Sequence, residues 1–107
     1  MVQQVYTLVV EVGRRAGDGL PEAATGAGLI CYAGGVDEEE AVRETVAILR
    51  QAELAPLEVT GHGTLPERLA AGEEVPEEER ALMARALAEN AVIVAEMTPF
   101  YDASAEA

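Results

Sequence analysis

The chain has 107 residues, half of them apolar, which is enough for one compact core and too little for a second domain. Twenty carboxylates stand against seven cations, all arginine, and this net charge of -13 argues against nucleic acid as a ligand because phosphate binding needs a basic surface. A single cysteine excludes an intramolecular disulfide. The absence of an export signal and of a long apolar run predicts a cytoplasmic protein without membrane contact.

The first part of the chain predicts two strands. Residues 5–12 alternate between apolar and polar positions, which is typical of a half-buried strand. Residues 13–28 hold five glycines and predict a long flexible loop, and residues 29–33 predict the second strand. Because the two strands are neighbours in sequence, we expect an antiparallel hairpin.

The middle of the chain carries two helix-start signals. Asp37 with Glu40 three residues later forms a capping-box pattern that predicts a helix ending before Pro56. A short strand is expected at 57–60. Thr64 with Glu67 predicts a brief capped helix over 66–71.

The last third predicts a helix and a buried strand. Pro76 and the acidic residues after it favour a helix to about Glu89, with Asn90 as a left-handed cap. The uninterrupted apolar run at 91–95 predicts a strand in the interior of the sheet, with Ile93 enclosed. Residues 98–107 are expected to be a strand end and, from 102 onwards, a frayed tail.

The expected fold is α+β, with about four mainly antiparallel strands in the order β-β-α-β-α-β and two main helices on one face, as a two-layer sandwich. The unit at residues 29–60, in which a strand, two glycines, a capped helix and a strand follow one another, resembles half of a ferredoxin-like sandwich. Helices on one face would leave Tyr6, Leu8 or Val9 uncovered on the other. The sequence therefore predicts a homodimer.

Candidate site residues are few. His62, the single histidine, lies between two glycines, where it is either a general base in a cleft or an ordinary exposed turn residue. No ligand stands beside it at metal-binding spacing, so neither a metal nor a cofactor is predicted. Gly34 and Gly35 could offer backbone N–H groups to a ligand ahead of the helix, although Asp37 and the three glutamates after it would repel an anion.

The remaining candidates are a thiol and the aromatic side chains. Cys31 is expected to be a packed, inert thiol. Tyr6 and Tyr32 stand on paired strands, and with Phe100 and Tyr101 they either line a small pocket or fill a dimer interface. The glutamate runs at 38–40 and 77–79 are interpreted as solvated helix starts.

Three functional hypotheses remain. The preferred one is a non-enzymatic, dimeric protein-interaction or regulatory module, because no nucleophile and base pair is recognisable. The second is a small-molecule-binding dimer or a small enzyme that uses His62 with Tyr32 or Tyr6. The third is an acidic, immunity-type or inhibitor-type protein that binds a basic partner, to which its carboxylates would steer it.

Overall fold

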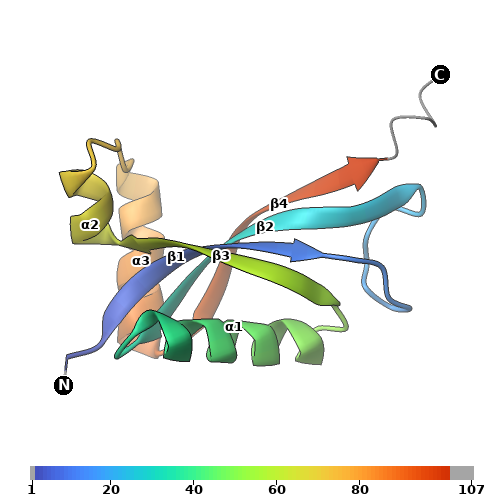
Figure 1. Cartoon of the computed structure of the whole chain (residues 1–107), viewed down its shortest axis with the longest axis horizontal. Helices are drawn as coiled ribbons and strands as arrows, with labels where there is room; N and C mark the ends of the chain where they lie inside the picture. The colour runs from blue at the N-terminus through green and yellow to red at the C-terminus, as the bar shows by residue number, and fades with distance from the viewer. Residues whose placement is uncertain (1, 102–107) are drawn as a thin grey trace.

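The computed structural model describes residues 2–101, which build one sheet and three helices (Figure 1). The expected frayed tail at 102–107 lies outside the described residues. No helix within residues 2–101 is long and apolar enough to cross a membrane. In chain order the elements are β1 (Gln4–Val12), β2 (Ala24–Gly35), α1 (Glu38–Gln51), β3 (Pro56–Thr64), α2 (Leu65–Ala70), α3 (Glu77–Glu89) and β4 (Val92–Tyr101).

The strand order is β3-β1-β2-β4, and every neighbouring pair is antiparallel. This confirms the α+β class and the β1–β2 hairpin. The ferredoxin-like order is not confirmed, since that sandwich runs β-α-β-β-α-β, whereas this chain begins with a hairpin.

The prediction of an interior position for the last strand is wrong, because β4 is an edge strand. Strand β1 already pairs with one edge of β2, so β4 takes the other edge. Helices cover only the start of its apolar run: Val92 packs against the cluster under α1 and Ile93 against the cluster under α3, whereas Val94 and Ala95 are exposed.

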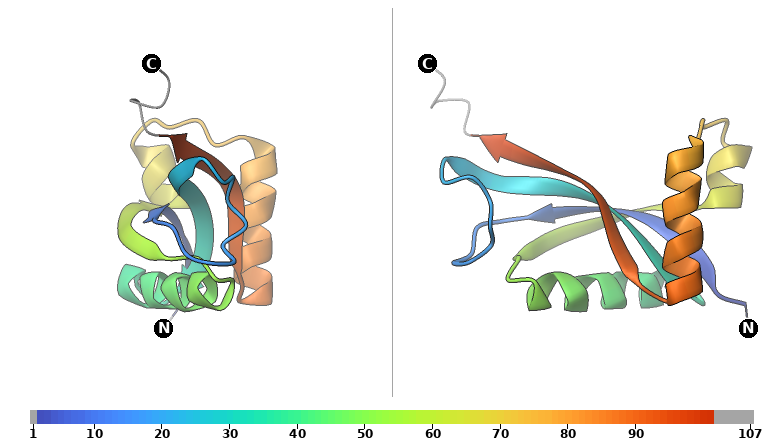
Figure 2. Two further views of the ribbon diagram at one scale, coloured as in Figure 1. Left: turned by 90° about the vertical axis from the view of Figure 1, so that its right-hand side faces the viewer. Right: turned by 180° about the vertical axis from the view of Figure 1, so that it is seen from behind.

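The two main helices cover opposite faces of the sheet, which corrects the expectation that they share one. Neighbouring side chains of a strand point to opposite faces. Cys31 belongs to the core that includes Ala41 and Leu49 of α1, whereas Tyr32 belongs to the core that includes Met83 and Ala86 of α3. Figure 2 shows the twisted sheet between the two helices.

The α1 face holds the larger core, and Leu8 is fully buried there. Tyr6 is half-buried against the same core, so of the three residues expected to be uncovered only Val9 lies on the other face. Of the uncovered sheet face that predicted the homodimer, only the part around Val9 is present, and the homodimer stays a prediction.

Two strands are longer than predicted. The β1–β2 loop spans only residues 13–23, because residues 24–28 already pair with β4. Strand β3 continues through His62 to Thr64, so the histidine is not in a turn.

The Arg14 guanidinium bridges the β1–β2 loop, donating to the carbonyls of Pro21, Glu22 and Ala24.

The helix ends follow their local chemistry. The Asp37 side chain accepts from the Glu40 backbone N–H, and Glu40 accepts in turn from the Val36 N–H. Thr64 and Glu67 form the complete reciprocal capping box of α2. Asn90 ends α3 in the left-handed conformation, with φ of 50°.

Candidate functional site

Helix α3 covers only one end of its sheet face. Helices α2 and α3 lie together at that end, while the β1–β2 loop and the end of β4 lie at the other (Figure 1). Beyond α3 the half-buried side chains of Val9 and Ile30 and the exposed ring of Phe100 form an apolar floor. We call Val9, Gly28, Ile30, Thr60 and Phe100 the open face.

Gly28 explains why an aromatic ring lies on this floor. A Cβ at Gly28 would stand 3.0 Å from Cζ of Phe100, so the glycine leaves room for the ring on the strand backbone. An aromatic side chain that covers a glycine on a neighbouring strand compensates for the packing that the glycine lacks.

His62 stands at the rim of the open face, at an irregular point of β3. Tyr6 pairs with Thr64 and Leu8 with Gly61, so β3 has one residue more than β1 across this step, a β-bulge. The exposed His62 lines a hollow of about 200 Å³. Among residues 2–101, no side chain is hydrogen-bonded to its imidazole. The other residues of the hollow are Thr7, Val9, Ile30, Arg68, Glu73 and Glu79.

A polar network forms the inner wall of this hollow. Arg68 of α2, whose side chain is only 11% exposed, donates from Nε to Glu73 (3.1 Å) and from Nη1 to Thr7 Oγ1 (3.1 Å). Its Nη1 also lies 3.9 Å from Oε1 of Glu79. The buried Tyr32 hydroxyl donates to the same Glu79 oxygen over 2.6 Å. The network thus joins β1, β2, α2 and α3.

Burial raises the pKa of Tyr32 to about 12, and the bond to Glu79 adds to this effect because it favours the protonated phenol. The phenol thus stays protonated and acts as a hydrogen-bond donor to the Glu79 carboxylate. This arrangement supports structure rather than proton transfer at neutral pH. Glu79 also departs from the prediction for its glutamate run, since it is half-buried and bonded.

Negative charge surrounds the open face. The His62 hollow and two adjoining hollows share Val9 or Ile30, and together they are lined by six carboxylates. Within the described residues, the lining of these three hollows contains one arginine, Arg68, and it already contacts two of the carboxylates. The carboxylates are Glu11, Glu58, Glu73, Glu78, Glu79 and Glu96.

The other candidates lie elsewhere. Tyr6 packs on the α1 face, where burial and the nearby Asp37 carboxylate raise its pKa, so it does not meet Tyr32. Gly35 packs tightly on α1, since a Cβ there would stand 2.8 Å from the Asp37 carbonyl. Cys31 is fully buried, and burial raises the pKa of its thiol to about 11.

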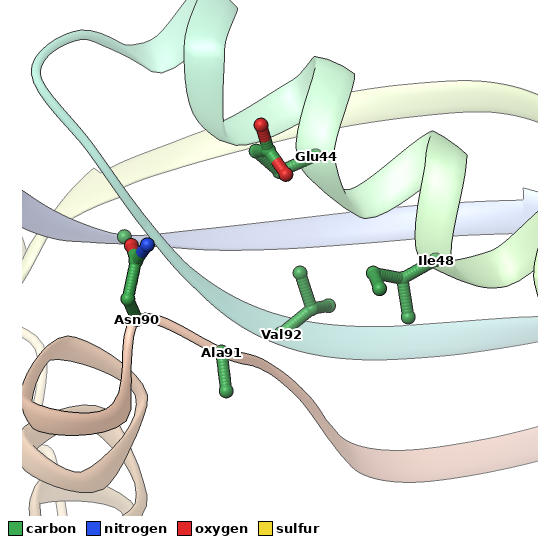
Figure 3. A pocket seen from close by; sticks show the side chains of 6 residues that line it. Glu44, Ile48, Asn90, Ala91 and Val92 are labelled. Atoms are coloured by element: carbon green, nitrogen blue, oxygen red, sulfur yellow. The ribbon is translucent and has the colours of Figure 1, made fainter.

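Gly34 lines a separate hollow of about 290 Å³ between α1 and the start of β4. Figure 3 shows Ile48 of α1 and Val92 of β4 on facing sides of this hollow, with Asn90 at one end. Along the same side of β4 follow Val94 and Met97, which are 42% and 43% exposed, while Ile48 is 40% exposed. We call Ile48, Val92, Val94 and Met97 the α1–β4 seam.

A comparison with known protein families gives a match that covers almost the whole fold. A family model described as "Domain of unknown function (DUF8846)" matches residues 5–101, from β1 to the end of β4. The chain belongs to this family. No curated protein and no solved structure matches it. The family description names no activity.

Sequence reasoning missed both principal members of the polar network. Arg68 and Glu79 are 11 residues apart, and Tyr32 is 47 residues from Glu79, so no local pattern connects them. One usable signal was present. Arg68 stands in a helix of only six residues that is otherwise Leu, Pro, Glu and Ala, where a long cation is well placed to reach the sheet.

Proposed function

We propose that this domain is a non-enzymatic protein-interaction module that forms a homodimer through the α1–β4 seam. The observation that carries the proposal is the concentration of exposed large apolar side chains on or beside β4. Of nine such side chains among the described residues, three belong to the seam, namely Ile48 of α1 and Val94 and Met97 of β4, and the half-buried Val92 lies beside them. Contiguous apolar surface of this kind is typical of an interaction site.

The seam is also the surface that two copies of an acidic chain can best bring together. Over its ten residues β4 carries one charged side chain, Glu96, and this residue lines the open face rather than the seam. On the α1 side, Glu44 is the one carboxylate that lines the hollow of the seam. A contact at the seam therefore brings fewer like charges together than a contact at the open face, although each copy carries a net charge of -13.

Backbone pairing adds a second attraction. Within residues 2–101, β4 is bonded to β2 on one side only, which leaves the main-chain groups of its outer edge available to another strand. A two-fold axis beside β4 would place two copies of this strand antiparallel, in one continuous sheet. Pro99 lacks an N–H and would limit the pairing to the stretch before it.

The same geometry gives less support to an enzyme. The hollow beside His62 has a volume of about 200 Å³, below the roughly 300–1,000 Å³ of usual small-molecule sites. Polar groups of its lining already bond one another, as Arg68 does with Thr7. Nothing in this arrangement activates a nucleophile.

Sedimentation equilibrium at micromolar concentration tests the dimer. We expect the wild type to show twice the 11.3 kDa chain mass. Met97→Glu should be monomeric, with a dimer Kd at least about a hundredfold weaker, because each copy would bury an unpaired carboxylate. Circular dichroism would verify that the variant is folded.

Leu57→Glu is the matched control. Leu57 is 67% exposed on β3, the opposite edge of the sheet, so the same change there should leave the dimer intact. A monomeric wild type, or equal dissociation of both variants, contradicts the proposal.

A further inference from the structure

We propose that the open face binds a basic amphipathic segment of a partner protein, with apolar side chains on the Val9, Ile30 and Phe100 floor and arginine or lysine side chains at the surrounding carboxylates. This surface is separate from the α1–β4 seam. It lies on the α3 side of the sheet, whereas the seam lies on the α1 side. The proposal therefore does not depend on the dimer.

The floor is shaped to receive side chains. Three adjoining hollows follow one another along the open face and share Val9 or Ile30 between them. The exposed Phe100 ring closes one end over Gly28, and α3 closes the other. An apolar face in contact with water favours a partner that brings apolar side chains of its own.

The negative charge around the floor favours a positively charged partner. The linings of these three hollows hold six carboxylates and one arginine, so carboxylates exceed arginines by five. The carboxylates come from β1, β3, β4 and α3 and from the segment before α3, so they surround the floor instead of meeting at one point. Spread charge of this kind complements an extended basic surface.

Two of these carboxylates lie directly opposite each other on neighbouring strands, an arrangement that sheets usually avoid. Glu11 and Glu58 are direct partners on β1 and β3, and both are exposed on the same face. Like charges directly opposite each other destabilise a sheet, and an opposite charge from a partner relieves this repulsion. Binding of a cationic side chain there therefore stabilises the domain as well as the complex.

The test uses the full chain and three synthetic helical peptides of equal length, one of leucine and lysine, one of leucine and glutamate, and one of serine and lysine. We expect only the leucine–lysine peptide to bind. In NMR spectra it should shift the backbone amide signals of Val9, Gly28, Ile30 and Thr60 and leave those of Ile48 and Val94 unchanged. Binding should weaken as salt screens the carboxylates.

Two matched pairs of variants locate the site. Glu11→Gln with Glu58→Gln should weaken binding about tenfold, whereas Glu22→Gln with Glu39→Gln removes the same charge away from the three hollows and should change it less than about twofold. Phe100→Ser should weaken binding, and Leu57→Ser, at the exposed β3 edge, should not.

Three results would overturn the proposal: equal binding of the serine–lysine peptide, equal loss in the two glutamine pairs, or shifts spread evenly over the surface. The Met97→Glu variant separates this proposal from the dimer. If Met97→Glu binds the peptide as the wild type does, the open face acts alone. If the wild type is monomeric and still binds, only the dimer proposal fails.

Discussion

The Tyr32 hydroxyl donates a hydrogen bond to Glu79 over 2.6 Å, and this bond fixes the first turn of α3 on the second half of β2. The folded domain holds the phenol in its protonated form, with a pKa of about 12 against 10.0 for an ordinary tyrosine. Because the folded pKa is the higher one, the contribution of Tyr32 is fully present below pH 10.

We therefore expect the free energy of unfolding to fall between about pH 10 and pH 12 as the unfolded chain loses this proton first. Urea unfolding followed by circular dichroism across this range measures the loss. Tyr32→Phe should cost about 1 kcal/mol at neutral pH through the lost bond and should make the alkaline fall smaller. If the wild type and Tyr32→Phe fall in parallel above pH 10, the phenol is not the group responsible.

Gly34 and Gly35 are adjacent at the end of β2 but differ in how closely other atoms approach them. A Cβ at Gly35 would meet the Asp37 carbonyl at 2.8 Å and the Ala41 nitrogen at 2.9 Å, and these backbone atoms cannot move without shifting α1. A Cβ at Gly34 has its nearest neighbours at 3.9 Å. Gly35→Ala should lower the stability by about 2 kcal/mol and Gly34→Ala by less than ~0.5 kcal/mol. Equal effects in denaturant unfolding would mean that the β2–α1 connection is not close-packed.

Helix ends were predictable because their chemistry is local. Asp37, Thr64 and Asn90 each act on backbone groups within a few residues, and the structure places each of them as its pattern indicated. The hairpin of β1 and β2 was predictable for a similar reason, since neighbouring strands usually pair.

Strand order and the candidate sites depend on contacts between distant residues, which the patterns do not contain. A continuous apolar run indicates that both faces of a strand are covered, and β4 satisfies this only at its start, with Val92 under α1 and Ile93 under α3, whereas Val94 and Ala95 are exposed. The bulge that holds His62 adds one residue to β3, which no periodicity shows. The contact of Arg68 with Glu79 arises only after α2 and α3 dock on the sheet.

The edge position of β4 predicts an unequal cost of two truncations. Leu29 is fully buried on β2, between β1 and β4, so Leu29→Ala should lower the stability by about 2–5 kcal/mol. Ile93 is half-buried on β4, and Ile93→Ala should cost about 1–2 kcal/mol, with an unchanged m-value. Urea unfolding of the two variants compares them directly. A larger loss for Ile93→Ala would contradict the edge position.

Arg68 and His62 line the same hollow of the open face, but we expect their substitution to change the stability by different amounts. Arg68 is nearly buried and bonds Glu73 and Thr7, so Arg68→Met should lower the stability by about 1–3 kcal/mol by leaving these groups without it. His62 is exposed, and His62→Ala should change the stability by less than ~0.5 kcal/mol. Thermal unfolding measures the stability of both variants. A large loss of stability in His62→Ala would show that the histidine supports the fold.

Amide hydrogen exchange tests the proposed dimer most directly, because the two edges of the sheet serve as each other's control. Strands β3 and β4 are both edges of the described sheet. If two copies pair through β4, the amides of residues 92–98 that do not bond to β2 should exchange slowly, and more slowly at higher protein concentration. The corresponding amides of β3 should exchange quickly at every concentration. Equally fast exchange at both edges, independent of concentration, would contradict the account.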